Sequence, residues 1–196
     1  MGRSPGTRCG NGHDGAILPR RRLLVALLAA AGVCHAIDDD DGRSEYQVKA
    51  AFVCRFGNYV EWPAQALGAA DEPFRVGVLA GSAVVEEFRR VAATASVAGH
   101  PVEVRRLASG EAPEGVHVLF VSRAMAGHAG EALAAVQGRP VLTVTELDPD
   151  GTTGMINFVL VDDRVRFDVL LPPATQSGLR ISVRLLGVAR RVEGKS

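Results

Sequence analysis

The chain has 196 residues, of which 47% are apolar and 5% aromatic, so it can bury one core of ordinary size and is predicted to form a single folded domain. The charges of its 22 basic and 22 acidic residues cancel, so the chain has no excess positive charge with which to attract phosphate groups. Nucleic acid is therefore excluded as the expected partner.

The first 36 residues have the order of a secretory signal peptide. Three arginines at 20–22 precede an apolar stretch over residues 23–33, and small residues follow up to Ala36. We expect residues 1–36 to be removed by cleavage after Ala36, which places the mature protein outside the cytoplasm.

Two other interpretations of this segment stay open. A transmembrane anchor would need about 20 apolar residues. The apolar stretch here covers only residues 23–33, and four aspartates follow soon after it, at 38–41. A lipoprotein would be acylated at Cys34, although Val33 stands where a small residue is normally needed. Both are less favoured than a soluble, secreted protein.

Cleavage after Ala36 would leave a mature chain with one cysteine. Cys54 then has no partner for an internal disulfide and is expected to be a small buried apolar residue. Residues 37–43 are predicted to be an acidic flexible leader, residues 44–192 the folded domain, and residues 193–196 a tail.

The first element of the domain is a predicted helix. Ser44 and Gln47 have capping-box spacing, and Pro63 stops the pattern. The residues at helical spacing are apolar: Tyr46, Ala50, Val53, Phe56 and Val60.

Strands and helices then alternate along the chain. Apolar runs and alternating patterns predict strands over 74–80, 102–107, 116–121 and 140–144, with helices over 84–93 and 126–137. Residues 155–161 and 164–170 form a predicted hairpin. Apolar residues from Ser177 to Val192 predict one long final helix.

This order of elements predicts an α/β fold. We expect a single three-layer domain with a mixed, partly parallel sheet flanked by helices and ending in an antiparallel hairpin.

No pattern for catalysis or cofactor binding is evident. The glycines after residue 76 do not have the spacing of a dinucleotide-binding or Walker loop, and no serine lies in a nucleophile elbow. Three histidines, which are expected to be structural or at the surface, lack a second ligand at metal-binding spacing: His100, His117 and His128. The acidic pairs Asp148 with Asp150 and Asp162 with Asp163 are typical of turns. We expect no enzyme activity, no cofactor and no metal.

The segment from Tyr46 to Pro63 stands out because it holds both tyrosines and the only tryptophan of the chain. Trp62 is expected to cap the core, with a partner-facing anchor as the second interpretation.

This segment resembles the opening signature of the YfiR family, a domain of unknown function in which a similar helix follows the signal peptide. Four further stretches agree with the family in the same order, so that the resemblance covers residues 44–192. They are Val76–Leu79, Val141–Val144, Gly154–Phe158 with Arg164–Phe167, and Gly178–Leu186.

The resemblance implies a periplasmic, dimeric repressor. Such a protein binds the periplasmic region of an inner-membrane diguanylate cyclase or related sensor and lowers cyclic di-GMP output, and an outer-membrane lipoprotein relieves this repression. The present chain departs from better known members because it lacks their paired cysteines and has Cys54-Arg55 where others have Tyr-Asn. These departures put redox control of the fold in doubt.

The expected partner-binding surface lies near the first and last helices. Arg55, Glu61 and Trp62 are the predicted contacts, with Arg180 and Arg184 as a charged rim. The alternative is a periplasmic receptor for a nucleotide or amino acid, bound after Leu79 and at neighbouring strand ends. A hydrolase is the least favoured interpretation.

Overall fold

A computed structural model describes residues 42–43, 45–69, 71–148 and 153–194, which all belong to the compact unit Asp40–Ser196. The predicted signal peptide, most of the acidic leader, Ser44 and Asp150 lie outside the described residues. Residues 42–43, which were expected in the leader, are helical.

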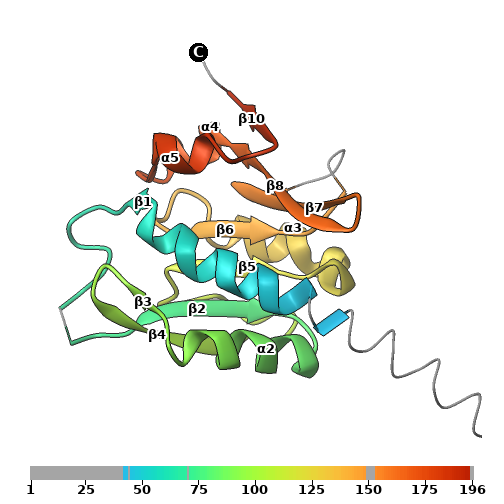
Figure 1. Ribbon diagram of the computed structural model, residues 1–196. Helices are drawn as coiled ribbons and strands as arrows, with labels where there is room; N and C mark the ends of the chain where they lie inside the picture. Colours follow the sequence, from blue (N-terminus) through green and yellow to red (C-terminus); the bar gives the residue numbers. More distant parts are fainter. Residues whose placement is uncertain (1–41, 44, 70, 149–152, 195–196) are drawn as a thin grey trace, which may run out of the picture. The chain divides into compact units, whose positions relative to one another are not determined.

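The domain is built on a mixed sheet with the strand order β10-β8-β7-β6-β5-β2-β4-β3 (Figure 1). The strands are β2 Phe74–Leu79, β3 Ser96–Val97, β4 His100–Arg106, β5 Val118–Val121, β6 Leu142–Thr145, β7 Ile156–Val161, β8 Arg164–Leu170 and β10 Arg191–Glu193. Strands β4, β2, β5, β6 and β7 are parallel, β8 is antiparallel to β7, and β10 runs parallel to β8.

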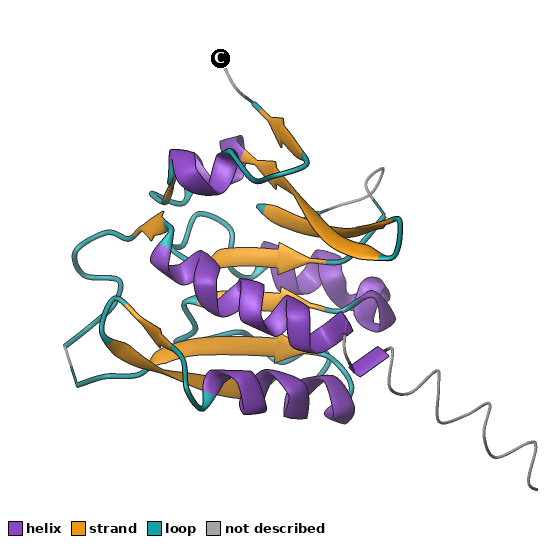
Figure 2. Cartoon of the chain, in the orientation of Figure 1, coloured by secondary structure: helices purple, strands orange, loops and turns teal. Residues whose placement is uncertain are grey.

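Helices cover both faces of this sheet (Figure 2). The N-terminal helix (residues 45–58) and α2 (Ser82–Ala92) pack with Phe120 in one apolar core, whereas α3 (Ala126–Ala134) packs with Leu119 in a second. Adjacent side chains of a strand point to opposite faces, so the two cores lie on opposite sides of β5. The predicted three-layer α/β fold is confirmed.

The burial of the two central strands agrees with their apolar sequences. All residues of β5 and β6 are buried, as expected for strands covered on both faces. Strand β4 alternates between buried or half-buried and exposed residues over most of its length, as its alternating pattern predicted.

The N-terminal helix is held against the sheet by aromatic rings. Phe56 lies 5.8 Å from Phe158 and 5.0 Å from Phe167, measured between ring centroids, and Phe52 lies 5.8 Å from Phe167. Contacts of this kind are worth about 0.5–1.5 kcal/mol each beyond the burial of apolar area. The helix ends at residue 58, and Val60, which was expected within it, belongs to β1 (Val60–Glu61).

The predicted hairpin is confirmed and its turn explains one acidic pair. Asp162 and Asp163 both have positive φ, 49° and 56°, as a two-residue hairpin turn between β7 and β8 requires. Aspartate tolerates this conformation better than most residues. These two carboxylates therefore have a structural reason for their position.

The prediction of one long C-terminal helix is wrong. Residues 171–193 form α4 (Leu171–Gln176), β9 (Arg180–Ile181), α5 (Val183–Leu186) and β10. Gly178 has a φ of +72°, which ends α4 in a left-handed conformation, and the following residues pair with β1. Strand pairing at both ends of α5 therefore replaces the continuous helix.

Candidate functional site

The structure brings four of the predicted contact residues to the surface and places the fifth against the core. Arg55, Glu61, Arg180 and Arg184 are exposed, whereas Trp62 is half-buried. The Trp62 ring lies 5.4 Å from Phe74, and its Nε1 donates a hydrogen bond to the Gly57 carbonyl at 3.0 Å. Capping the core was the favoured interpretation of Trp62, and these contacts agree with it.

Two strands that are distant in the sequence join most of the other predicted residues. β1 and β9 pair in antiparallel fashion, with Glu61 opposite Arg180, and Ser182 donates its amide to the Tyr59 carbonyl at 2.9 Å. Arg184 follows in α5, and Arg55 lies one turn before Tyr59. We call this surface the β1–β9 face and define it by Arg55, Tyr59, Glu61, Arg180, Val183 and Arg184.

The β1–β9 face has an apolar part and an unbalanced charge. Val183 is 81% exposed and Tyr59 is 38% exposed, so both offer apolar surface to a partner. Three arginines and one glutamate give the face a net positive charge. Its chemistry suits an acidic, partly apolar protein surface.

A second site lies at the other end of the N-terminal helix and was not predicted. Lys49, whose side chain is only 1% exposed, forms ion pairs with Glu45 and with Glu146, which is 3% exposed. Arg123 pairs with the same two glutamates, and the Tyr46 hydroxyl donates to Glu146 at 2.7 Å. We call these five residues the Lys49 network.

Strand topology explains why this network assembles. Arg123 begins the short helix η1 (Arg123–Met125) soon after β5, and Glu146 directly follows β6, so that the carboxyl ends of two neighbouring parallel strands present them together. The Arg123 amide also donates to Glu146 at 2.8 Å. One sequence signal could have found the site, because Lys49 occupies the apolar side of the helix pattern, between Tyr46 and Val53.

Burial and charge shift two pKa values in the network. Burial, followed by the charge of Glu146, raises the pKa of the Tyr46 phenol well above its ordinary value. Burial lowers the pKa of Arg123, but the charges of Glu146 and Glu45 outweigh that effect and the net shift is upward. Tyr46 thus stays a neutral donor and Arg123 a cation.

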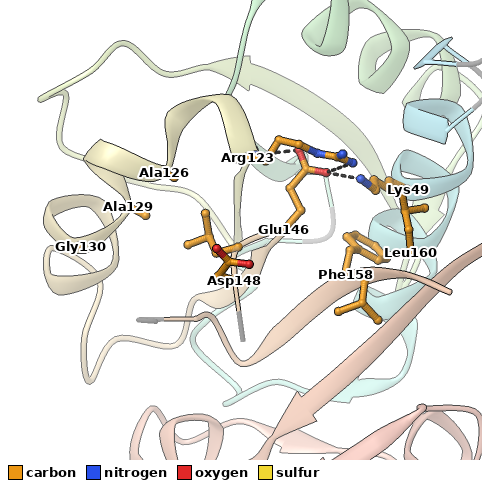
Figure 3. A pocket seen from close by; sticks show the side chains of 11 residues that line it. Lys49, Arg123, Ala126, Ala129, Gly130, Glu146, Asp148, Phe158 and Leu160 are labelled. Carbon is orange, nitrogen blue, oxygen red and sulfur yellow. Dashed lines mark hydrogen bonds and ion pairs between the residues drawn. The ribbon is translucent and has the colours of Figure 1, made fainter. Parts of the chain in front are cut away.

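A cavity of about 620 Å³ opens beside the network (Figure 3). Its lining comes from the N-terminal helix, α3, the end of β6 and β7, and consists of Lys49, Arg123, Ala126, Ala129, Gly130, Glu146, Leu147, Asp148, Phe158, Val159 and Leu160. Asn157 fixes the segment after β6, because its side-chain amide exchanges two hydrogen bonds of 2.9 Å with the Leu147 backbone. These bonds hold Leu147, and Asp148 follows it at the cavity as an exposed residue.

The ligand site expected after Leu79 is much smaller. The hollow beside Leu79, at the end of β2, has a volume of about 100 Å³, whereas pockets for small organic ligands measure roughly 300–1,000 Å³. The larger cavity lies at the neighbouring strand ends, which were part of the same prediction.

Two of the three histidines form hydrogen bonds with the backbone, the third lies at the surface, and the cysteine is buried. His117 accepts a hydrogen bond from the Arg75 amide at 2.8 Å, His100 bonds the Glu72 carbonyl at 2.8 Å, and His128 is exposed. Burial raises the pKa of the Cys54 thiol to about 11. Within the described ranges, no group of three or more histidines, cysteines or acids could hold a metal ion.

Among the residues that the structure describes, no helix combines the length and apolar character needed to cross a membrane. The chain matches the YfiR/HmsC-like domain family (DUF4154) over residues 46–190, and no curated protein matches it with significant similarity. Because the match covers most of the chain, the protein belongs to the YfiR/HmsC-like family. This is a family of regulatory domains of the periplasm, as the resemblance of the first helix and the four later stretches implied.

Proposed function

We propose that this protein is a periplasmic repressor that binds the periplasmic region of an inner-membrane diguanylate cyclase, or a related sensor, and lowers cyclic di-GMP output. Family membership over residues 46–190 is the observation that carries the proposal. A regulator of this kind acts by binding and needs no catalytic group of its own.

The β1–β9 face is the surface proposed to contact the sensor. Protein interfaces combine an apolar centre with a polar rim, and this face offers Val183 and Tyr59 beside Arg55, Arg180 and Arg184. Its positive charge would speed association with an acidic region of the sensor. Trp62 contributes indirectly, because its packing against Phe74 holds the end of the N-terminal helix in place.

The test is binding of the purified mature protein to the periplasmic region of an inner-membrane diguanylate cyclase or related sensor from the same organism. Val183→Asp puts a charge in the apolar part of the face, and Arg184→Glu reverses one of its charges. We expect Val183→Asp to weaken binding by about 2 kcal/mol or more, as for a central interface residue. Arg184→Glu is expected to slow association and to reduce its dependence on salt.

Matched control variants distinguish an effect at the β1–β9 face from the effect of an added or reversed charge elsewhere on the surface. Val161→Asp changes a valine that is 37% exposed in β7, beside the turn to β8, and Arg166→Glu changes an exposed arginine of β8. Both control variants are expected to bind the sensor normally. If they weaken binding as much as Val183→Asp and Arg184→Glu do, the β1–β9 face is not the contact surface.

The cellular part of the proposal has its own tests. Export with cleavage after Ala36 predicts a periplasmic protein whose measured mass is that of a chain beginning at Ile37. An acylated Cys34 would contradict this. A homodimer is proposed on the family resemblance, and light scattering of the purified protein should give twice the mass of the mature chain. Deleting the gene should raise cyclic di-GMP, and capture by an outer-membrane lipoprotein should do the same.

A further inference from the structure

The cavity beside the Lys49 network has the size of a site for a small organic molecule. Its volume of about 620 Å³ lies in the middle of the range of roughly 300–1,000 Å³ that such sites occupy. It opens at the carboxyl ends of β5 and β6, where open parallel sheets bind ligands.

One side of the cavity is apolar. Leu147, Phe158 and Leu160 line it together with Ala126 and Ala129 of α3. Leu160 is 46% exposed although it lies in a strand of the sheet, so a ligand seated here would remove apolar surface from water. An aliphatic or aromatic body of a ligand suits this side.

The charges on the other side decide the sign of the ligand. The two cations that line the cavity, Lys49 and Arg123, are already paired with Glu45 and Glu146. Asp148 also lines the cavity, and no described residue forms a hydrogen bond or an ion pair with its carboxylate. With these five groups ionised the site carries one net negative charge, which favours a cation over an anion.

From this arrangement we infer that the cavity binds a small organic cation, a protonated amine on an apolar body. In the proposed complex the ammonium group pairs with Asp148, and the body packs against Leu147, Phe158 and Leu160, which line the cavity. Figure 3 labels Asp148, Phe158 and Leu160. The edge of the site is shared with Lys49, so an occupied cavity also contacts the helix that leads to the β1–β9 face. This inference is independent of the identity of the sensor.

Calorimetric titration of the purified mature protein with matched probes tests the inference. The probes are phenethylammonium and hexylammonium as cations, with 3-phenylpropionate and 2-phenylethanol as an anion and a neutral compound of similar shape. We expect saturable binding of at least one ammonium probe and a raised melting temperature in its presence. The inference is overturned if neither ammonium probe binds, or if 3-phenylpropionate binds more tightly than both.

Two pairs of variants locate the binding. Asp148→Asn removes an exposed charge at the cavity and should weaken ammonium binding by about two- to fivefold, whereas Asp163→Asn at the hairpin turn should leave it unchanged. Gly130→Leu places a side chain in the cavity from α3, and Gly127→Leu adds the same side chain to the same helix outside the lining. A Cβ at either glycine meets nothing within 4 Å, so both variants should fold. Equal binding by Gly130→Leu and Gly127→Leu would place the amine elsewhere and refute the site.

Discussion

Replacement of Lys49 by methionine should destabilise the protein more than any surface charge change. Methionine preserves most of the volume of the side chain, so the effect is mainly electrostatic. The loss leaves Glu146, which is 3% exposed, without the ammonium that pairs with it. Breaking a buried ion pair from one side costs about 3–5 kcal/mol. The lower end, about 3 kcal/mol, applies here because Tyr46 and the Arg123 amide still donate to Glu146, and the Arg123 guanidinium still pairs with it at 3.5 Å.

Urea unfolding followed by the fluorescence of Trp62, the only tryptophan, measures this effect. With a slope of about 2 kcal/mol per molar urea, a loss of about 3 kcal/mol lowers the unfolding midpoint by about 1.5 M. Glu146→Gln alone should also destabilise, because it leaves Lys49 with Glu45 only. The double variant Lys49→Met with Glu146→Gln has no buried charge at this pair, and it should lose at least about 2 kcal/mol less than the sum of the single variants.

The control is an ion pair on the surface. Arg89 pairs with Glu86, and their side chains are 49% and 60% exposed. Arg89→Met should therefore cost less than about 1 kcal/mol. A cost of similar size for Lys49→Met, or strict additivity in the double variant, would refute the view that the network acts as one buried unit.

Three further predictions concern groups outside the network. Because burial raises the pKa of Cys54 to about 11, its thiol should react with iodoacetamide at pH 8 far more slowly in the folded protein than in urea; equal rates would mean that Cys54 is accessible. Burial lowers the pKa of His117, so the unfolded chain binds a proton that the folded protein does not. This contribution to stability is complete above the ordinary pKa of about 6.5 and is lost progressively as the pH falls from there through the lower pKa of the folded protein. Thermal unfolding is followed between about pH 7.5 and 5 at constant salt. The melting temperature should fall less over this range for His117→Gln than for the exposed control His128→Gln, and equal falls would contradict the assignment. Gly154→Ala should destabilise by about 1–3 kcal/mol, because its Cβ would lie 2.8 Å from a backbone oxygen of β6, whereas Gly127→Ala in α3 should be neutral or stabilising; unfolding midpoints in urea compare the two.

The order of elements could be predicted from local pattern because each strand or helix repeats its own period of apolar residues. The first helix shows this well, since Ala50, Val53 and Phe56 are all buried as the pattern indicated. Continuous apolar runs likewise predicted that β5 is a central strand and that β6 is buried, and both strands are buried throughout. These features depend on residues that are neighbours in the chain.

The C-terminal segment and the Lys49 network depend on residues that are far apart in the chain. The apolar residues from Leu179 to Val192 also suit a helix, and only hydrogen bonds to β1 and β8 make short strands the better solution there. Lys49 and Glu146 are 97 positions apart, and no local period indicates that they meet. Sequence pattern thus determined the elements as far as β8 and indicated the family. The tertiary structure alone decided the C-terminal elements and which charges share the buried site, because burial and pairing arise only when distant parts of the chain come together.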